Sequence, residues 1–292
     1  MVINMNGDDE MEHALLLQNV SKTYEKFQLD NINLELPKGC IMGFVGENGA
    51  GKSTTIKLIM DLIKRDSGEI QILGQDNKGD ISQLKEHIGV VMDECCFPEN
   101  MNWRHIKQVM KRLYKTWDEQ KFCSLMEKFS LEEKKIVKEY SRGMKMKLSI
   151  AAALSHDSKL LILDEATSGL DPVVRDEILE LFLEFIQDEE HSIFMSTHII
   201  SDLERISDYI ACIHKGRLVF VEQKDELLSK YGILKCGEED FSKIDKSIVK
   251  GVKRNSFGIE ALVEKRKVHG NHVIDAASIE EIMLYFIKES KI

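Results

Sequence analysis

The sequence predicts an α/β fold with a core of buried parallel strands. The apolar residues 41–45 lead into a glycine-rich loop, and a helical pattern follows over residues 54–60. Further along, residues 160–163 are four consecutive apolar residues that run into two acids, the pattern of a strand buried on both faces of a parallel sheet. A chain of 292 residues can hold one large domain of this kind and a smaller addition, because single hydrophobic cores stop growing near about 250–300 residues.

The glycine-rich loop matches the pattern G-x-x-x-x-G-K-[ST] of a phosphate-binding loop. Its residues are Gly46, Glu47, Asn48, Gly49, Ala50, Gly51, Lys52, Ser53 and Thr54. Glycine permits positive φ and lets backbone N–H groups approach an anion, which the start of the following helix also attracts. We expect Lys52 to reach the β- and γ-phosphates of a nucleotide and the Ser53 hydroxyl to ligate Mg²⁺. A purely structural turn is the alternative, and the flanking strand and helix favour the nucleotide site.

Two acids and a histidine follow two of the expected strands. Asp164 and Glu165 end the apolar run of residues 160–163, and His198 ends the run of residues 193–197. Ligands of open α/β folds lie at the carboxyl ends of the strands. We therefore expect Asp164 to hold Mg²⁺, directly or through water, and Glu165 to polarise the attacking water as general base. His198 is expected to contact phosphate. A strand that simply ends in a charged turn is the alternative for the two acids.

Turn and cap signals predict the remaining elements. Strands are expected over residues 15–24, 32–36 and 70–73, and helical periodicity dominates residues 102–154. Asp171 and Pro172 provide the N-cap and first position of a helix that runs to residue 186. Residues 209–221 predict a hairpin. Three patterns of the form Ser-x-x-Glu predict further helix starts, at Ser130 with Glu133, Ser201 with Glu204 and Ser278 with Glu281.

The charge and the cysteine content of the chain indicate the kind of partner and compartment to expect. The net charge is −10 with a pI near 5.5, which disfavours sequence-independent binding to nucleic acid, so we expect a protein partner. The six cysteines follow no CxxC spacing, which fits a reducing compartment without a zinc site or disulfide framework. Residues 1–13 lack a signal-peptide pattern, and no apolar run approaches the roughly 20 residues of a membrane span. We therefore expect a cytoplasmic protein.

The order of these motifs resembles the ATP-binding subunit of an ABC transporter, and the resemblance covers residues 14–224. That family carries an L-S-G-G-Q signature at the start of a helix, and residues 140–144 stand at this place as Y-S-R-G-M. Ser141 and Gly143 are retained, and the resemblance implies that their hydroxyl and backbone N–H contact the γ-phosphate. Arg142 replaces the first glycine of the signature, and a methionine replaces its glutamine.

Other site residues follow from the same resemblance. Residues 168–171 match the D-loop of the family, His198 matches its switch histidine, and Tyr24 stands where the family stacks an aromatic ring on adenine. The family usually has a glutamine where the chain enters the helical subdomain, and here Asp93 or Glu94 takes that place. An acid there is expected to contact Mg²⁺ or its water. The expected metal-binding residues are thus Ser53, Asp164 and Asp93.

The resemblance implies a P-loop NTPase (RecA-like) core with an N-terminal antiparallel β subdomain and an inserted helical subdomain at about residues 94–157. Residues 225–292, where short strand-like pieces alternate with charged loops before a last helix, are expected to form a small α+β accessory region. The implied activity is hydrolysis of ATP with Mg²⁺. Two copies, identical or closely related, would each hold ATP between the phosphate loop of one chain and the Ser141 segment of the other.

Such an ATPase drives a separate membrane-spanning permease from the inner face of the membrane. The acids at 93–94, the S-R-G-M form and the last helix resemble bacterial exporters of antimicrobial peptides, drugs or similar amphiphiles. At least one of Phe97, Met101 and Trp103 is expected to be exposed beside a cleft that receives the permease. A soluble ABC-type ATPase acting on DNA or ribosomes is the alternative, although the chain lacks the coiled-coil insertion or the second cassette of those classes.

Overall fold

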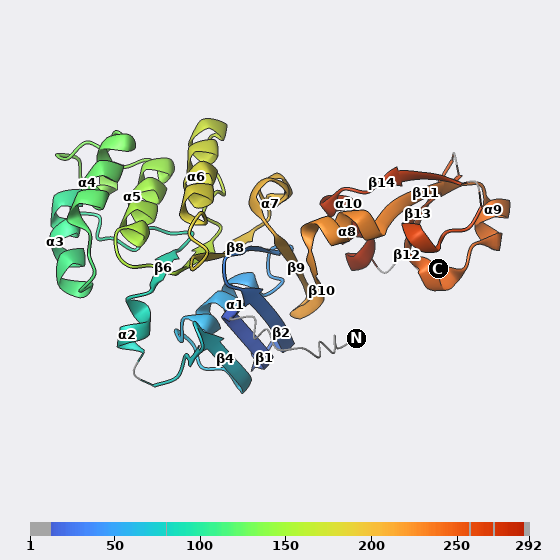
Figure 1. The fold of residues 1–292 in the computed structure, drawn as a ribbon, viewed down its shortest axis with the longest axis horizontal. Helices are drawn as coiled ribbons and strands as arrows, with labels where there is room; N and C mark the ends of the chain where they lie inside the picture. Colours follow the sequence, from blue (N-terminus) through green and yellow to red (C-terminus); the bar gives the residue numbers. More distant parts are fainter. Residues whose placement is uncertain (1–12, 80, 257, 271, 289–292) are drawn as a thin grey trace.

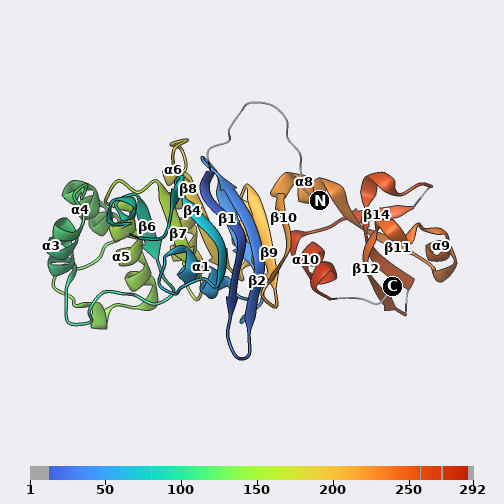
Figure 2. The same cartoon turned by 90° about the horizontal axis from the view of Figure 1, so that it is seen from below.

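The computed structural model describes residues 13–79, 81–256, 258–270 and 272–288 (Figure 1). Residues 1–12, which are most of the segment expected to lack a signal peptide, lie outside the described residues. The molecule is elongated. Two sheets lie in the middle, a group of helices lies at one end, and the C-terminal part of the chain lies at the other (Figures 1 and 2).

A six-stranded sheet forms the core, in the order β10-β9-β3-β8-β7-β6. Its strands are β3 (Ile41–Val45), β6 (Ile88–Val91), β7 (Leu160–Asp164), β8 (Ser192–Thr197), β9 (Tyr209–His214) and β10 (Arg217–Gln223). All neighbours are parallel except β10, which runs antiparallel to β9. Every residue of β3, β7 and β8 is buried, and this explains why these strands are nearly continuous apolar runs in the sequence.

A smaller antiparallel sheet, in the order β2-β1-β4-β5, covers one face of the core. Its strands are β1 (His13–Thr23), β2 (Gln28–Pro37), β4 (Ser67–Ile72) and β5 (Gln75–Asp76). Helix α1 (Lys52–Ile59) shares one buried cluster with both sheets, through Ile56 and Ile59 on the helix and Phe44 on β3. The helix that carries Lys52 is thus held between the two sheets, and the predicted antiparallel subdomain is confirmed.

Helices cover the other face and form the subdomain between β6 and β7. The subdomain consists of α3 (Trp103–Leu113), α4 (Glu119–Lys128), the 3₁₀ turn η1 (Val137–Glu139) and α5 (Arg142–Leu154), and α6 (Pro172–Phe185) and α7 (Ile200–Ile206) follow β7 and β8. The short helix α2 (Ser82–Lys85) precedes β6, and its Leu84 joins the buried cluster shared with the antiparallel sheet. Buried side chains of α3 to α7 form a second cluster with the face of the sheet that presents Val45, Leu161 and Met195. Helices α3, α4 and α5 lie together at one end of the molecule (Figure 1).

The chain after β10 forms a third sheet, in the order β12-β13-β11-β14. Its elements are α8 (Lys224–Lys230), β11 (Tyr231–Cys236), α9 (Glu238–Lys243), the 3₁₀ turns η2 (Lys246–Ile248) and η3 (Lys265–Lys267), β12 (Val249–Asn255), β13 (Gly258–Glu264), β14 (Val273–Ala276) and α10 (Ile279–Ile287). Helix α10 packs back on the core, where the ring of Phe286 lies 5.5 Å from that of Phe220 on β10. We propose that residues 225–292 are an accessory unit joined to a domain of residues 14–224.

Two of the three predicted Ser-x-x-Glu helix starts are wrong. Ser130 follows the end of α4 with a φ of 52°. Its N–H donates to the carbonyl of Glu127 at 2.9 Å, and the N–H of Leu131 donates to that of Met126 at 3.0 Å. This is the Schellman arrangement that ends a helix. Ser201 lies inside α7, whose N-cap makes no side-chain hydrogen bond. The pattern alone therefore does not locate a helix boundary.

The other predicted caps are confirmed. The Asp171 carboxylate accepts a hydrogen bond from the N–H of Val174 at 3.1 Å, with Pro172 at the first position of α6. Ser278 and Glu281 form a full capping box at the start of α10. Among the described residues, no helix has the combined length and apolar character that crossing a bilayer requires.

The turn between β9 and β10 ties the phosphate loop to the antiparallel sheet. The N–H of Gly216 donates to the carbonyl of Ala50 at 2.9 Å, and its own carbonyl accepts from the N–H of Asp30 at 2.8 Å. Gly216 has a φ of +77°, and a Cβ there would lie 1.8 Å from the carbonyl oxygen of Gln28. Only glycine fits both the backbone angle and the space at this position.

We predict that Gly216→Ala destabilises the protein more than Gly74→Ala. Gly74 has nearly the same φ, +76°, but an added Cβ there would meet nothing within 4 Å. Its substitution is expected to cost about 1 kcal/mol of strain. Gly216→Ala is expected to cost about 1–3 kcal/mol more, because backbone atoms must move. Urea unfolding followed by circular dichroism measures both, and equal losses in the two variants would contradict the prediction.

Candidate nucleotide site

A cavity of about 750 Å³ opens at the carboxyl ends of β3, β7 and β8. It is lined by Lys26, Phe27, Glu47, Asn48, Gly49, Gly51, Lys52, Ser53, Thr54, Asp93, Arg142, Glu165, Ser168 and His198. The cavity thus brings together the phosphate loop and the ends of two other core strands. This is the edge of a parallel sheet at which open α/β folds bind ligands.

The phosphate loop turns sharply from β3 into α1. Gly49 and Gly51 have φ values of +82° and +121°, which favour glycine. A Cβ on Gly51 would lie 3.0 Å from Leu29 and 3.1 Å from the ring of Phe27, so the loop also packs closely on the antiparallel sheet. The Lys52 ammonium group donates to the carbonyl of Gly46 at 2.7 Å. The lysine is therefore held over the loop at the start of α1.

Glu165 lies between two positively chargeable groups. Its Oε1 is 3.4 Å from Lys52 Nζ, and its Oε2 is 2.7 Å from His198 Nδ1. The side chains of Glu165 and Lys52 are 14% and 6% exposed, whereas that of His198 is 50% exposed. Glu165 also has a φ of +52°, an angle that costs a residue other than glycine about 1–2 kcal/mol. Strained backbone of this kind is concentrated at functional sites.

Asp164 and Ser53 offer oxygen atoms on the same side of the cavity. The Ser53 hydroxyl lies 3.4 Å from Asp164 Oδ1, and Asp164 is only 4% exposed. A hydroxyl and a carboxylate suit Mg²⁺, which usually keeps several waters and binds through one or two carboxylates together with substrate phosphates. The residues present therefore fit this ion.

Ser196 is a site residue that the sequence analysis missed. Its hydroxyl donates to Asp164 Oδ1 at 2.6 Å and accepts from the N–H of Glu165 at 3.3 Å. From the neighbouring strand β8, where it is fully buried, it orients the Asp164 carboxylate and holds the backbone of Glu165. The available signal was a serine directly after the apolar residues of this strand, since a buried hydroxyl must find hydrogen-bond partners.

Tyr24 and Phe27 lie at the β1–β2 turn beside the cavity. Tyr24 is 45% exposed and does not line the cavity, and Lys22 Nζ lies 5.7 Å from its ring centroid. Phe27, which the sequence analysis did not single out, lines the cavity. The stacking of adenine on Tyr24 stays a prediction.

The signature segment meets the cavity through a residue that was not expected there. Ser141 is the N-cap of α5, and its hydroxyl accepts from the N–H of Met144 at 3.3 Å. Ser141 and Gly143 do not line the cavity of their own chain, but Arg142 between them does. A contact of Ser141 or Gly143 with the phosphate of another chain stays a prediction.

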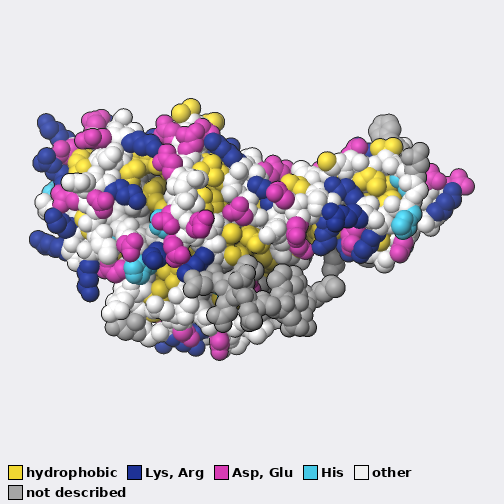
Figure 3. All heavy atoms as spheres, in the orientation of Figure 1, with side chains coloured by type: hydrophobic (Ala, Val, Ile, Leu, Met, Phe, Trp, Pro, Cys, Tyr) yellow, Lys and Arg dark blue, Asp and Glu magenta, His cyan; other side chains and the backbone are white. Residues whose placement is uncertain are grey.

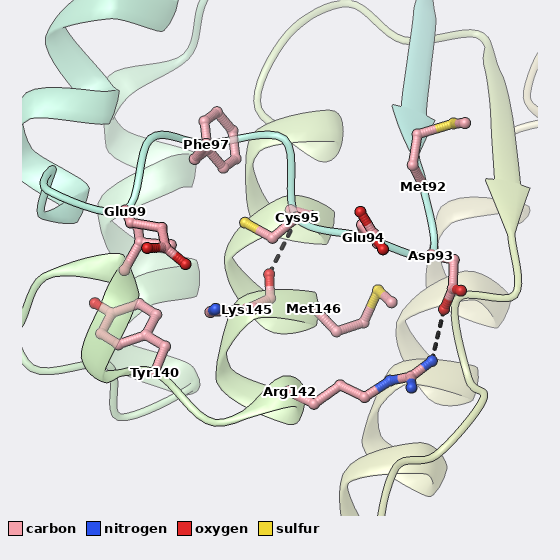
Figure 4. Close-up of a pocket in the computed structure, with 12 residues that line it drawn as sticks. Met92, Asp93, Glu94, Cys95, Phe97, Glu99, Tyr140, Arg142, Lys145 and Met146 are labelled. Carbon is pink, nitrogen blue, oxygen red and sulfur yellow. Dashed lines mark hydrogen bonds and ion pairs between the residues drawn. The ribbon is translucent and has the colours of Figure 1, made fainter.

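Of the two acids after β6, only Asp93 reaches the nucleotide cavity. Asp93 and its partner Arg142 line both the nucleotide cavity and a neighbouring cavity of about 420 Å³, whereas Glu94 lines only the neighbouring one, with Phe97 (Figure 4). The position of Asp93 is compatible with the expected metal contact, which stays a prediction. Phe97, Met101 and Trp103 are all half-buried against the helical subdomain. We expected at least one of the three to be exposed beside a cleft, and each is only partly exposed.

Comparisons with known proteins give the family of the chain. The family model described as ABC transporter matches residues 29–168. The bacitracin transport ATP-binding protein BcrA of Enterococcus faecalis is 34% identical over 212 residues, which cover 72% of this chain and 69% of that protein. The lantibiotic transport ATP-binding protein SrtF of Streptococcus pyogenes is 35% identical over 216 residues, which cover 72% of this chain and 91% of that protein.

A solved structure shares the fold. The structure of an ATP-binding subunit of an ABC transporter superposes with a TM-score of 0.67 at 26% identity, over 73% of this chain and 91% of that chain. The predicted α/β fold with a phosphate-loop core is therefore confirmed.

We predict that Ser196→Ala lowers the rate of ATP hydrolysis by about tenfold while ATP affinity changes little. The substitution removes the donor to Asp164 Oδ1, and a hydrogen bond to a charged group contributes about 1.5–3 kcal/mol. About 1.4 kcal/mol of barrier corresponds to a factor of ten in rate. Turnover and equilibrium ATP binding, measured separately, test this positioning role.

Ser192→Ala is the matched control. Ser192 is equally buried at the opposite end of β8, where its hydroxyl accepts from the N–H of Gly39 at 3.1 Å. Its loss is expected to lower stability but to leave the rate unchanged. A similar fall in rate for both variants would mean that Ser196 acts through the stability of the strand alone.

Proposed function

Because this chain belongs to the ATP-binding subunits of the ABC transporter family, and is an ATPase that powers a transporter, we propose that it drives the export of amphiphilic peptide antibiotics. The observation that carries the mechanism is the position of Glu165 between Lys52 and His198 at the end of β7. Two relatives are named for the transport of bacitracin and of lantibiotics, and these names support peptide antibiotics as the substrate class.

In this mechanism Glu165 is the general base. A carboxylate that is only 14% exposed beside the phosphate loop can accept a proton from the attacking water, and His198 orients it through its second oxygen. Lys52 moves from Glu165 to the β- and γ-phosphates of ATP, where its charge stabilises the transition state. The departure of Lys52 leaves the Glu165 carboxylate available to water.

Mg²⁺ would be held by Ser53 and Asp164, with Asp93 near the same cavity. The ion would neutralise charge that develops on the transferred phosphoryl group. The hydrogen bond from Ser196 would keep the Asp164 carboxylate in place to hold the ion. Tyr24, which is 45% exposed beside the cavity, is available to stack on the adenine ring.

Two chains, identical or closely related, would complete two sites. Ser141 lies at the exposed N-terminus of the 13-residue helix α5 and does not line the cavity of its own chain. A helix start with a hydroxyl and free N–H groups favours an anion, so the segment of Ser141 and Gly143 can receive the γ-phosphate bound to a second chain. Closure of the two chains on ATP would then move the membrane-spanning permease.

The permease would contact the helical subdomain at the inner face of the membrane. A groove of about 380 Å³ there is lined by Asn100, Met101, His105, Gln108, Val109 and Arg112. Val109, which lines the groove, and Leu113 on the same helix α3 are 40% and 65% exposed, so apolar side chains are available to a partner here.

The alternative of a soluble ATPase acting on nucleic acid has less support. The net charge is −10, and acidic and basic side chains are interspersed over the core on the face shown in Figure 3. Binding to nucleic acid depends on a concentrated positive surface. The relatives reported above are named for transport.

We predict that Glu165→Gln lowers ATP turnover by roughly 10²-fold or more but keeps ATP affinity, because general-base catalysis contributes on that order. The variant is expected to form an ATP-dependent dimer in size-exclusion chromatography, since ATP is no longer consumed. Lys52→Ala, which removes the cation at the phosphates, is the control that loses binding. Turnover near that of the wild type would remove Glu165 from the role of base.

The same variant tests the substrate. Cells that produce the wild-type chain with its permease are expected to tolerate several-fold more bacitracin or lantibiotic than cells with Glu165→Gln. If ATP turnover is present and tolerance to these peptides is unchanged, the substrate belongs to another class.

We predict that Val109→Glu disrupts co-purification with the permease while ATP binding by the isolated chain stays intact. The substitution places a charge in the apolar part of the groove without filling the protein core, because Val109 is 40% exposed. Leu62→Glu is the matched control, since Leu62 is a 63% exposed apolar residue outside the helical subdomain. A complex that survives Val109→Glu would place the contact elsewhere.

A further inference from the structure

Arg142 links the signature helix to the loop after β6. It is the first residue of α5, and its Nη2 donates to Asp93 Oδ1 at 2.6 Å, across 49 positions of sequence. Figure 4 shows the side chain extended from the end of the helix toward Asp93. The ion pair therefore joins the helical subdomain to the edge of the core at the point where β6 ends.

The guanidinium group of Arg142 is held from a second side by the D-loop. A Cβ added to Gly169, which has a φ of +67°, would lie 3.2 Å from both Cζ and Nη1 of Arg142. The arginine thus packs directly on the backbone of Gly169. Its position depends on two segments of the core as well as on α5.

Arg142 and Asp93 both line the nucleotide cavity of their own chain, together with Lys52 and Glu165. Two of the cations in this cavity are paired with acids, Lys52 with Glu165 and Arg142 with Asp93. Both partners of the Arg142–Asp93 pair are 50% exposed, and ion pairs at such exposed sites are weak. Arg142 can therefore leave Asp93 for a stronger partner at little cost in free energy.

The γ-phosphate of ATP is such a partner. A terminal phosphate carries about −1.5 to −2 charges and three acceptor oxygens, against one charge and two oxygens on Asp93. The planar guanidinium group binds phosphate with two parallel hydrogen bonds. ADP has no γ-phosphate, so it lacks the group that would replace Asp93 as the partner of Arg142.

We propose that Arg142 senses the γ-phosphate of ATP bound to its own chain, and that ATP, unlike ADP, opens the Arg142–Asp93 ion pair. The inference rests on the nucleotide site proposed above. When the pair opens, the ion pair between the start of α5 and the loop after β6 is lost. Because Ser141 is the N-cap of the same helix, release of Arg142 frees the segment that would meet the second chain.

The first test is equilibrium binding of ATP and of ADP in EDTA, where any metal contact of Asp93 plays no part. Arg142→Ala is expected to weaken ATP binding by about tenfold and to leave ADP binding unchanged, because it removes a charge-assisted hydrogen bond to the γ-phosphate alone. Arg142→Lys is expected to lose less, since it keeps the charge. Lys145→Ala is the matched control: Lys145 lies one turn further along α5 and does not line the nucleotide cavity.

The second test releases Arg142 by changing its partner. Asp93→Asn is expected to raise ATP affinity in EDTA by about threefold, as the competing carboxylate is gone. The double variant is expected to bind ATP like Arg142→Ala, because Asp93 acts through Arg142. Equal losses of ATP and ADP binding in Arg142→Ala, or no loss of either, would overturn the inference, and so would an unchanged ATP affinity in Asp93→Asn.

Different results would refute the proposed nucleotide site and the proposed role of Arg142. If the wild-type chain binds neither nucleotide, or if Lys52→Ala binds ATP as the wild type does, the nucleotide site itself is wrong and the inference falls with it. If Lys52→Ala loses binding while Arg142→Ala keeps the wild-type ratio of ATP to ADP affinity, the site stands and only the role of Arg142 is refuted.

Discussion

The contact between Lys52 and Glu165 is the constraint on which the site depends. Their charged atoms lie 3.4 Å apart, and the side chains are 6% and 14% exposed. An unpaired charge at such low solvent exposure would strongly destabilise the protein. Pairing allows the protein to keep a cation and a base beside the phosphate loop. In the proposed mechanism, a nucleotide that binds Lys52 would leave the Glu165 carboxylate available to the attacking water.

The fold supplies this pair by bringing three strand ends together. Lys52 follows β3, Glu165 follows β7, and His198 follows β8, and these strands are parallel neighbours with fully buried residues. Because the strands are rigidly packed, small hydroxyl groups can orient the acids, as Ser196 does for Asp164. The left-handed angle of Glu165 is tolerated because its N–H also donates to the carbonyl of Ser196 at 3.0 Å.

Units at the two ends of the sheet connect this rigid site to the rest of the molecule. The helical subdomain reaches the cavity through Arg142 and presents its exposed apolar side chains on α3. The accessory sheet contacts the core through α10 and β10, and the turn at Gly216 that precedes β10 holds the carbonyl of Ala50 in the phosphate loop. Both units therefore contact elements that border the phosphate loop or the nucleotide cavity.

The sequence by itself determined what depends on neighbours along the chain. The phosphate loop, the buried strand before Glu165 and the cap at Asp171 are short-range patterns, and each was predicted from its own residues. The starts assigned to Ser130 and Ser201 were wrong because the same short pattern also occurs at a helix end and within a helix. Only the tertiary structure decided which distant side chains meet. The hydrogen bond of Ser196 with Asp164 spans 32 positions and the pair of Arg142 with Asp93 spans 49, and such contacts depend on strand order and subdomain packing that no local pattern encodes.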